Sequence, residues 1–229
     1  MPALFVAGAG TDVGKTHVTA GLIRILRAQG RPIEALKPLV SGFDPDDWAD
    51  SDPGRLLQAL GRPLDIGALQ AISPWRYRAP LSPDMAAARE GAAIDFDAVV
   101  GLCRQRIAEA QDRLLLIEGV GGVMSPISPV TTNLDWMTAL GVPVLLVGGS
   151  YLGSISHTLT AAAVIRAAGL QVAALAVSES AGAGTPFDET LASLARLSGL
   201  AVVGVRRDAA AEAWAPKLLE ALRPSFRTL

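Results

Sequence analysis

A glycine-rich turn near the N-terminus constrains the fold of this chain more than any other feature of its sequence. It follows the apolar run Ala3 to Ala7 and precedes a segment, starting at Lys15, whose apolar residues recur at helical spacing. Glycines let consecutive backbone N–H groups point into one concavity, and a helix N-terminus carries partial positive charge, so this order suits a phosphate. A plain surface turn with an exposed lysine is the alternative, but the complete Gly-Lys-Thr ending favours a phosphate-binding loop. The turn reads Gly8, Ala9, Gly10, Thr11, Asp12, Val13, Gly14, Lys15, Thr16.

The turn departs from the usual spacing of a P-loop, in which four residues separate a glycine from Gly-Lys-Ser/Thr. Ala9 stands at the expected glycine position, and the glycine comes one residue earlier, at Gly8. We still expect Lys15 to reach the terminal phosphates of a nucleotide and the Thr16 hydroxyl to bind Mg²⁺. The residues of this segment that we predict to bind the nucleotide are Asp12, Val13, Gly14, Lys15, Thr16 and His17.

Short apolar runs alternate with helical patterns along most of the chain. Most of the runs are continuous rather than alternating in polarity, which is typical of parallel strands covered on both faces. We therefore predict an α/β fold of the P-loop NTPase type: a doubly wound, mostly parallel sheet with helices on both faces and ligands at the carboxyl ends of its strands. Strands are expected at Ala3–Ala7, Ile33–Leu36, Leu114–Ile117, Val142–Val147, Val172–Val177 and Ala201–Val203. Helices are expected at Lys15–Ala28, Gly54–Leu60, Asp95–Ala110, Asn133–Leu140, Ser154–Ala168, Pro186–Ser198 and Ala209–Leu222.

The segment from Val40 to Glu90 breaks this rhythm, because it is rich in Pro, Asp and Ala and shows only one clear helix. We expect it to run over the face that carries the site rather than to form a second domain. With 229 residues, 50% of them hydrophobic, the chain is long enough to bury a full core. We therefore predict one domain over residues 1–229.

Two charged residues stand where predicted strands end. The run Leu114 to Ile117 leads into Glu118 and the turn Gly119-Val120-Gly121, which would lie beside the P-loop in a parallel sheet. A carboxylate there can hold Mg²⁺ directly or through water, although a strand-end glutamate can also be merely solvated. Lys37 ends the second strand, where a fixed cation would stabilise a transferring phosphoryl group, and Ser41 could donate a hydrogen bond. A strand-end lysine on its own more often points to solvent.

Composition and charge narrow the class of partner. The formal net charge of −2 gives no basic surface for nucleic acid, and no apolar run approaches the roughly 20 residues of a membrane helix. Cys103 is the only cysteine of the sequence and cannot form an internal disulfide, and the start of the chain has no basic flank or cleavage site. We expect a cytoplasmic protein that binds small molecules or a second copy of itself, without nucleic-acid or membrane partners.

Taken together, the motifs resemble those of the dethiobiotin synthetase family. The long-spaced loop is similar to the family's Gly-Thr-x-Thr-Glu-Val-Gly-Lys-Thr, with Asp12 in place of the more usual glutamate. Four further segments match in the same order: Lys37-Pro38 to Ser41-Gly42, Pro80-Leu81-Ser82-Pro83, Glu118 to Gly122, and Leu152 to His157, which resembles Leu-Gly-x-Ile-Asn-His. The set as a whole is far more specific than any one of these pieces.

The resemblance implies a ligase that forms C–N bonds. CO₂ and 7,8-diaminononanoate would give a carbamate, which takes the γ-phosphoryl group of ATP. The second amine then closes the cyclic urea, so that the products are dethiobiotin, ADP and phosphate. Lys15, Lys37 and Mg²⁺ would neutralise phosphoryl charge, and Thr11 and Ser41 would hydrogen-bond the carbamate or the reacting end of the substrate.

The resemblance also implies a metal site and a second substrate contact. An aspartate would join Thr16 and Glu118 around Mg²⁺, and we expect Asp52, with Asp50 as the alternative. Either aspartate could instead be only an N-cap or first-turn acid of the following helix. The substrate carboxylate would lie at the start of the helix that begins near Ser154, reached across a homodimer interface. The residues expected there are Gly153, Ser154, Ile155 and Ser156, whereas His157 is assigned no chemistry.

Two segments depart from the family pattern. After the strand Val172 to Val177 the family usually has Asn-Asp for base recognition, and this chain has Ser178-Glu179. A serine hydroxyl cannot offer a base the paired donor and acceptor of an amide, so Ser178 is placed at the base while the preference for adenine stays open. The stretch Gly204 to Arg207 also lacks the family's Gly-x-Ile-Pro turn.

Two other functions remain as alternatives. A partitioning ATPase of the Min or Par type would share the fold, but such proteins carry an extra lysine early in the loop, where this chain has Gly10. A catalytically inactive nucleotide-binding regulator would account for Ser178. The presence of Lys37, Asp52 and Glu118 together argues against the regulator.

Overall fold

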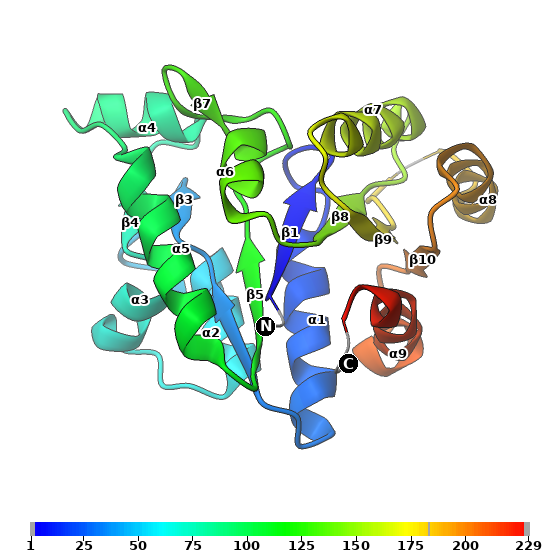
Figure 1. Cartoon of the computed structure of the whole chain (residues 1–229), viewed down its shortest axis with the longest axis horizontal. Coiled ribbons are helices and arrows are strands. Elements are labelled where there is room, and N and C mark those ends of the chain that lie inside the picture. The colour runs from blue at the N-terminus through cyan, green and yellow to red at the C-terminus, as the bar shows by residue number, and fades with distance from the viewer. Residues whose placement is uncertain (1–2, 183, 227–229) are drawn as a thin grey trace.

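The computed structural model describes residues 3–182 and 184–226, and its centre is a six-stranded sheet (Figure 1). The strand order is β10-β9-β8-β1-β5-β2, and every neighbouring pair is parallel. The strands of the sheet are β1 (Ala3–Gly8), β2 (Ile33–Leu36), β5 (Leu114–Glu118), β8 (Val144–Gly148), β9 (Val172–Ser178) and β10 (Val202–Val205). The predicted doubly wound parallel α/β fold is confirmed.

Helices cover both faces of the sheet. The chain moves from β1 towards β2 in one direction and through β5, β8, β9 and β10 in the other, so right-handed crossovers place α1 opposite α5, α6, α7 and α8. In agreement with this, α1 packs against α2 and α9, whereas α5 packs against α6 and α7 against α8. None of the helices that the structure describes is long and apolar enough to cross a membrane. Their bounds are α1 (Lys15–Ala28), α2 (Asp52–Leu60), α5 (Phe96–Ala110), α6 (Asn133–Leu140), α7 (Ser154–Ala167), α8 (Phe187–Ser198) and α9 (Ala211–Leu222), with short 3₁₀ turns η1 (Trp48–Asp50) and η2 (Arg223–Ser225).

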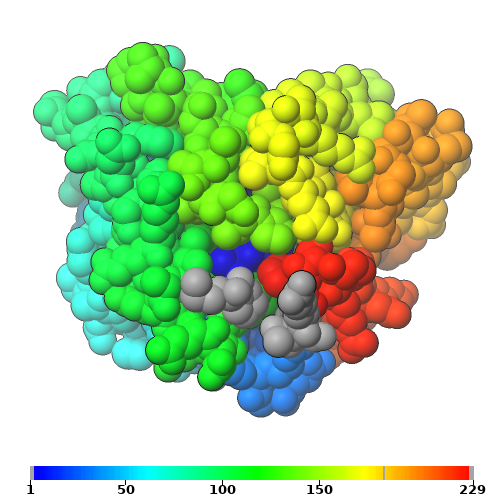
Figure 2. All heavy atoms as spheres, in the orientation of Figure 1, coloured from blue at the N-terminus to red at the C-terminus, as the bar shows by residue number. Residues whose placement is uncertain are grey.

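The central strands are the most deeply buried part of the molecule. Every residue of β1, β5 and β8 is buried, as their continuous apolar sequences predict. Phe5 of β1 packs edge-on against the Trp136 ring of α6, with the ring centroids 5.1 Å apart. In the space-filling view only a small part of the dark-blue first strand is visible between its neighbours (Figure 2). The strand ends that carry polar residues are therefore held by a rigid apolar core.

The segment from Val40 to Glu90 contains more regular structure than the sequence predicts. It holds α2, α3 (Ile66–Ile72) and α4 (Pro83–Arg89), and its strand β4 (Trp75–Tyr77) pairs with β3 (Leu39–Ser41) in parallel. The expectation of a single clear helix is wrong because α3 and α4 are too short to show a periodic pattern. Their starts are set by local signals: the Asp65 side chain caps α3, accepting from the Ala68 N–H at 2.7 Å. The remaining two strands, β6 (Pro126–Ser128) and β7 (Thr131–Thr132), form a small antiparallel pair.

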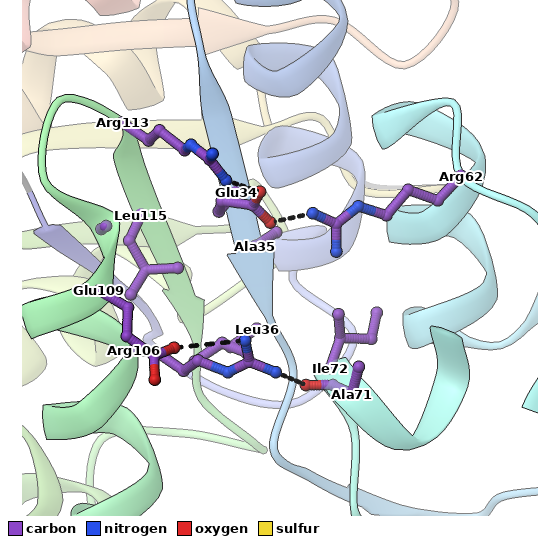
Figure 3. A pocket seen from close by; sticks show the side chains of 11 residues that line it. Glu34, Ala35, Leu36, Arg62, Ala71, Ile72, Arg106, Glu109, Arg113 and Leu115 are labelled. Atoms are coloured by element: carbon purple, nitrogen blue, oxygen red, sulfur yellow. Dashed lines mark hydrogen bonds and ion pairs between the residues drawn. The ribbon is translucent and has the colours of Figure 1, made fainter. Parts of the chain in front are cut away.

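Charged side chains close the outer edge of β2 (Figure 3). Arg62 and Arg113 both pair with Glu34, the latter with Nη1 at 3.0 Å from Oε1. Arg106 donates to the Ala71 carbonyl at 3.0 Å, and the group lines a cavity of about 170 Å³. Since these arginines already have partners within the chain, the network suits protection of an exposed sheet edge rather than capture of an anion.

Candidate active site

A cavity of about 730 Å³ lies at the carboxyl ends of β1, β2 and β5. Its walls come from the loop after β1, the chain after β2, the start of α2, the segment before α4 and the loop after β5. In a parallel sheet these segments meet at one edge, so residues distant in sequence converge there. The residues predicted for the site that line this cavity are Thr11, Asp12, Gly14, Lys15, Thr16, His17, Lys37, Ser41, Asp52, Val120 and Gly121.

The loop between β1 and α1 has a backbone conformation that explains its glycines. Gly14 has a φ of 89° and Asp12 a φ of 55°, so both lie in the left-handed region. A Cβ at Gly8 would lie 2.9 Å from the Lys15 Nζ and 2.7 Å from the Gly10 carbonyl oxygen. Only glycine therefore leaves room for the lysine to fold back over the loop, which gives the early glycine of this long-spaced loop a steric cause.

Lys15 is buried and fixed by two carbonyl groups. Its Nζ donates to the carbonyl oxygens of Gly121 at 2.8 Å and Gly10 at 3.3 Å. Burial first, and the neighbouring Lys37 second, lower the pKa of Lys15 from 10.5 to about 8, although nearby carboxylates act in the opposite sense. An anion such as a phosphate would favour the charged form again. The ammonium is thus positioned before any ligand arrives.

Lys37 lies at the end of β2 with 2% of its side chain exposed. Its Nζ is 2.9 Å from Glu118 Oε1 and 3.0 Å from Asp52 Oδ2, and it donates to the Gly119 carbonyl at 2.8 Å. Burial disfavours the charged ammonium, but Asp52 and Glu118 outweigh burial and hold the pKa of Lys37 above its ordinary value. The lysine is therefore a permanent cation at the point of the sheet where negative charge on a transferring group would need one.

The Thr16 hydroxyl lies between two carboxylates. Its Oγ1 is 2.7 Å from Asp52 Oδ1 and 2.6 Å from Glu118 Oε1. A hydroxyl has one proton and donates to only one of them at a time, so three oxygens converge with a single proton between them. Burial opposes the charge on Asp52, but Lys37 outweighs it and, with the hydrogen bond from Thr16, brings the pKa of Asp52 to about 2. The Asp52 carboxylate is therefore available as an anionic ligand at neutral pH.

These oxygens fit Mg²⁺. Oε2 of Glu118 is buried and has no hydrogen-bond partner among the described residues, as expected for a carboxylate oxygen directed at a cation. Mg²⁺ prefers oxygen ligands and usually keeps waters and substrate phosphates beside one or two carboxylates. Within residues 3–182 and 184–226 no group of three or more His, Cys, Asp or Glu could hold a metal. A Mg²⁺ at Thr16, Asp52 and Glu118 would therefore depend on phosphates for its remaining ligands.

The glycine turn after β5, Gly119–Gly122, is held from two sides. Lys37 and Lys15 each donate to one of its carbonyl oxygens at 2.8 Å. Asn133, at the start of α6, donates to two more, one of them at 2.7 Å. The sequence does not reveal the role of Asn133, because an amide that opens a helix gives no sign of which loop it faces.

The structure distinguishes between the two candidate aspartates. Asp52 lies in the first turn of α2 and reaches Thr16, whereas Asp50 lies in η1 and is exposed. Ser51, between them, caps α2, since its hydroxyl accepts from the Gly54 N–H at 3.4 Å. Asp52 is therefore free to turn into the cavity.

Several predicted residues do not line the cavity. Val13, Glu118 and Gly119 stand next to residues that do, whereas two further groups lie elsewhere in the chain. Gly153–Ser156 open α7 beside a second cavity of about 500 Å³, which is lined by later residues of α7 and shares Thr11 and Ser125 with the first. Ser178 ends β9 against the start of α1, where its Oγ is only 2.6 Å from the place of a Cβ on Gly14. Within one chain, neither group contacts the cluster formed by Lys37, Asp52 and Glu118.

The mouth of the cavity carries one cation, Arg55, that the sequence analysis does not assign. Arg55 of α2 lines the cavity beside His17. Burial first, and then Arg24, Arg55 and Arg207, lower the pKa of His17. The lowered pKa favours the neutral form of His17, so Arg55 is the cation at this part of the cavity.

The fold and the site define a nucleotide-binding class of protein. A family model described as an AAA domain matches residues 2–205. The structure is similar to chloroplast FtsY from Physcomitrella patens, with a TM-score of 0.54 and 15% identity, over 96% of this chain and 64% of that one. It is also similar to the MinC:MinD cell division protein complex of Aquifex aeolicus, with a TM-score of 0.51 and 11% identity. The match covers 98% of this chain and 86% of that one. These likenesses show the P-loop NTPase fold.

Relatives with much higher identity narrow the class. The ATP-dependent dethiobiotin synthetase BioD of Caulobacter sp. (strain K31) is 56% identical over 195 residues, 85% of this chain and 83% of that protein. The protein of the same name from Phenylobacterium zucineum (strain HLK1) is 50% identical over 225 residues, 97% of this chain and 95% of that protein. The chain belongs to the ATP-dependent dethiobiotin synthetase family. The resemblance identified from its motifs is confirmed.

Proposed function

We propose that this chain is an ATP-dependent dethiobiotin synthetase, a ligase that builds a cyclic urea from 7,8-diaminononanoate and CO₂. The observation that carries the proposal is the buried group at the strand ends, in which Lys37 contacts Glu118 and Asp52 beside the P-loop residues Lys15 and Thr16. A site that only exchanged nucleotides would not need a second buried lysine there. The family membership points to the same reaction.

The reaction we propose has three steps. One amine of the substrate adds to CO₂ and gives a carbamate. A carbamate oxygen then bonds to the γ-phosphorus of ATP while the bond to the β–γ bridging oxygen breaks, which releases ADP and leaves a carbamic-phosphoric anhydride. The second amine bonds to the carbamoyl carbon, phosphate leaves with the bonding electrons, and the amine protons pass to phosphate and water. The product is dethiobiotin.

The residues of the cavity would act mainly by position and charge. Lys15 would bind the terminal phosphates, and Lys37 would stabilise charge on the transferring phosphoryl group and the carbamoyl oxygen. Thr11 and Ser41 line the same cavity and would donate hydrogen bonds to the carbamate. Mg²⁺ held by Thr16, Asp52 and Glu118 would neutralise phosphate charge. The backbone from Asp12 to His17, with the turn Gly119–Gly121, would cradle the phosphates.

The proposal includes a homodimer. Gly153–Ser156 open α7 and do not line the main cavity of their own chain, so we propose that a substrate carboxylate bound there spans two copies. Val130, between β6 and β7, and Leu152, just before α7, are exposed apolar side chains at 88% and 89%, and would suit contact with a partner. We further propose one domain over the chain, a cytoplasmic location and small-molecule partners, without nucleic acid or membrane.

One assay tests the function. Purified protein is incubated with 7,8-diaminononanoate, bicarbonate, Mg²⁺ and each nucleoside triphosphate in turn, and dethiobiotin and phosphate are quantified together. We expect one phosphate for each dethiobiotin, and no phosphate release without the diamine. Nucleotide hydrolysis that ignores the diamine and gives no ring product would contradict the proposal.

The two alternatives are less well supported. The likeness to a MinC:MinD complex, at 11% identity, shows the fold alone. A regulator without catalysis would have no need to keep Lys37 paired with two carboxylates, which the structure shows.

A further inference from the structure

Arg55 extends from α2 into the mouth of the main cavity. It stands three residues after Asp52, so the two side chains leave the helix on the same side. Asp52 contacts Thr16 deep in the site, and Arg55 lines the same cavity one turn further along. The position of the helix is fixed, because a Cβ on Gly54 would lie 2.3 Å from the Ala49 carbonyl oxygen. Arg55 is therefore directed at the cavity by the same packing that directs Asp52.

The guanidinium of Arg55 has no partner in the described part of the chain. No hydrogen bond or ion pair engages it there, whereas Arg62 and Arg113 at the edge of β2 both pair with Glu34 (Figure 3). A guanidinium offers five donors in a planar fork that matches two oxygens of a phosphate. A free fork at the mouth of a phosphate site is suited to an anionic ligand.

The place of Arg55 indicates which phosphates it would meet. It lines the same cavity as His17, the residue after Thr16 in the first turn of α1. In a P-loop, the backbone at this turn cradles the α- and β-phosphates, while the lysine reaches the β- and γ-phosphates. Lys15 and Lys37 already occupy the deep end of the cavity. Arg55 thus lies on the side of the phosphates that ATP and ADP share.

We propose that Arg55 binds the α- or β-phosphate of the nucleotide directly, as a positioning residue supplied by α2. The inference rests on the proposed use of ATP at this site. Because the contact involves groups common to ATP and ADP, Arg55 holds the nucleotide in place both before and after phosphoryl transfer. Lys15 and Lys37 remain the cations of the transfer itself.

Binding measurements on four proteins test this. The dissociation constants of MgATP and MgADP are measured by calorimetry for the unmodified chain, Arg55→Ala, Arg55→Lys and Arg24→Ala. We expect Arg55→Ala to weaken both nucleotides about tenfold, as loss of a charge-assisted contact would, and Arg55→Lys to recover part of the loss. Arg24 is an exposed residue of α1 whose charge also acts on His17 but which does not line the cavity, so Arg24→Ala should stay within about twofold.

Three results would overturn the inference: an unchanged dissociation constant in Arg55→Ala, an equal loss in Arg24→Ala, or a loss for ATP alone. The thermal midpoint of each variant shows that it is folded. These titrations contain no diamine, so they stand apart from the ring-forming assay. If the unmodified chain binds nucleotide but forms no dethiobiotin, the proposed function is refuted and the titrations still decide the role of Arg55. If the unmodified chain forms dethiobiotin and Arg55→Ala binds nucleotide unchanged, only the role of Arg55 is refuted.

Discussion

The phosphate side of the site and the side that we propose for the base differ in how their charges are fixed. On the phosphate side, Lys15, Lys37 and Glu118 are buried and bound to one another or to loop carbonyls. They stand at the ends of strands or in loops at the centre of the sheet, where the core around them is rigid. Each charge therefore has a defined position before a ligand binds.

The proposed base side lies at the end of β9 and β10, towards the edge of the sheet. Arg206 is 53% exposed there, and its Nη2 lies 2.8 Å from Asp188 Oδ1. Glu179 accepts from the Arg207 N–H at 3.1 Å, and Ser178 packs against the start of α1. Exposed pairs of this kind contribute about 0–1 kcal/mol each, so the charges are weakly held.

The difference indicates how recognition is divided in this molecule. Phosphates are the same in every nucleoside triphosphate, and fixed charges recognise them well. Discrimination between bases needs paired donors and acceptors in defined places, and the base side offers a hydroxyl and surface ion pairs. We therefore expect strong dependence on the phosphate side and weak discrimination between bases, and four variants test this in order of expected effect.

The largest effect is expected from Lys37→Met. The change leaves Glu118 and Asp52 without their shared cation, and a buried charge that loses its partner costs about 3–5 kcal/mol. Loss of a cation that stabilises the transferring group should also lower kcat by about 10²–10³-fold. Urea unfolding and the rate of dethiobiotin formation measure the two effects separately.

Lys217→Met is the matched control, because Lys217 is an exposed lysine of α9 outside the site. We expect its stability and turnover to be unchanged. A Lys37→Met protein with an unchanged urea midpoint would refute the importance of the buried pair for stability, and normal turnover would remove Lys37 from the mechanism.

A smaller effect is expected from Gly14→Ala, at the point where the two sides touch. The new Cβ would lie 2.6 Å from Ser178 Oγ, and the φ of 89° would itself cost an alanine about 1–2 kcal/mol. Nucleotide affinity should fall because the P-loop must shift. Gly91→Ala separates the strain of a positive φ from the contact with Ser178. Gly91 has a φ of 68°, and nothing lies within 4 Å of the added Cβ. Equal destabilisation of the two variants would show that the contact with Ser178 is unimportant.

The residues that the sequence predicts well are those that stand at the ends of elements. Lys37 follows the short strand Ile33–Leu36 and Glu118 follows the apolar run Leu114 to Ile117, and the rule that parallel strands present their carboxyl ends together brings both to the P-loop without any knowledge of contacts. Thr16 follows from the motif itself. For Asp52 only the family resemblance preferred it to Asp50, because two acids two residues apart look alike until the first turn of α2 is placed.

The residues that the sequence misses depend on the direction of a helix. Asn133 holds the glycine turn from the first turn of α6, and Arg55, for which we propose a nucleotide contact, lies in the first turn of α2, so both depend on which loop or cavity those turns face. Helical periodicity identifies a buried face but not the neighbour that buries it. The seven-residue helices α3 and α4 were missed for a related reason, since they are too short for a periodic pattern.

A modest effect is expected from the titration of Asp52. Its pKa falls from 3.8 to about 2 on folding, so the carboxylate stabilises the fold above about pH 4 and loses this contribution as the pH falls towards 2. With 43% of the side chain exposed, solvent screens the interaction and the contribution is small. Urea unfolding in EDTA should show the stability difference between the unmodified chain and Asp52→Asn shrinking over that range. Asp50→Asn, which changes an exposed aspartate outside the cavity, is the matched control, and a difference for Asp52→Asn that is constant down to pH 2 would contradict the assignment.

The smallest effect is expected from Ser178→Ala. The hydroxyl packs towards Gly14 and does not line the cavity, and one neutral hydrogen bond contributes only about 0.5–1.5 kcal/mol. The ratios of kcat/KM for ATP, GTP and CTP should therefore change by less than about threefold, because a lost contact must differ between bases to alter their ratio. A change above about tenfold would show that Ser178 takes part in base recognition. The base side of the site would then be as well defined as the phosphate side.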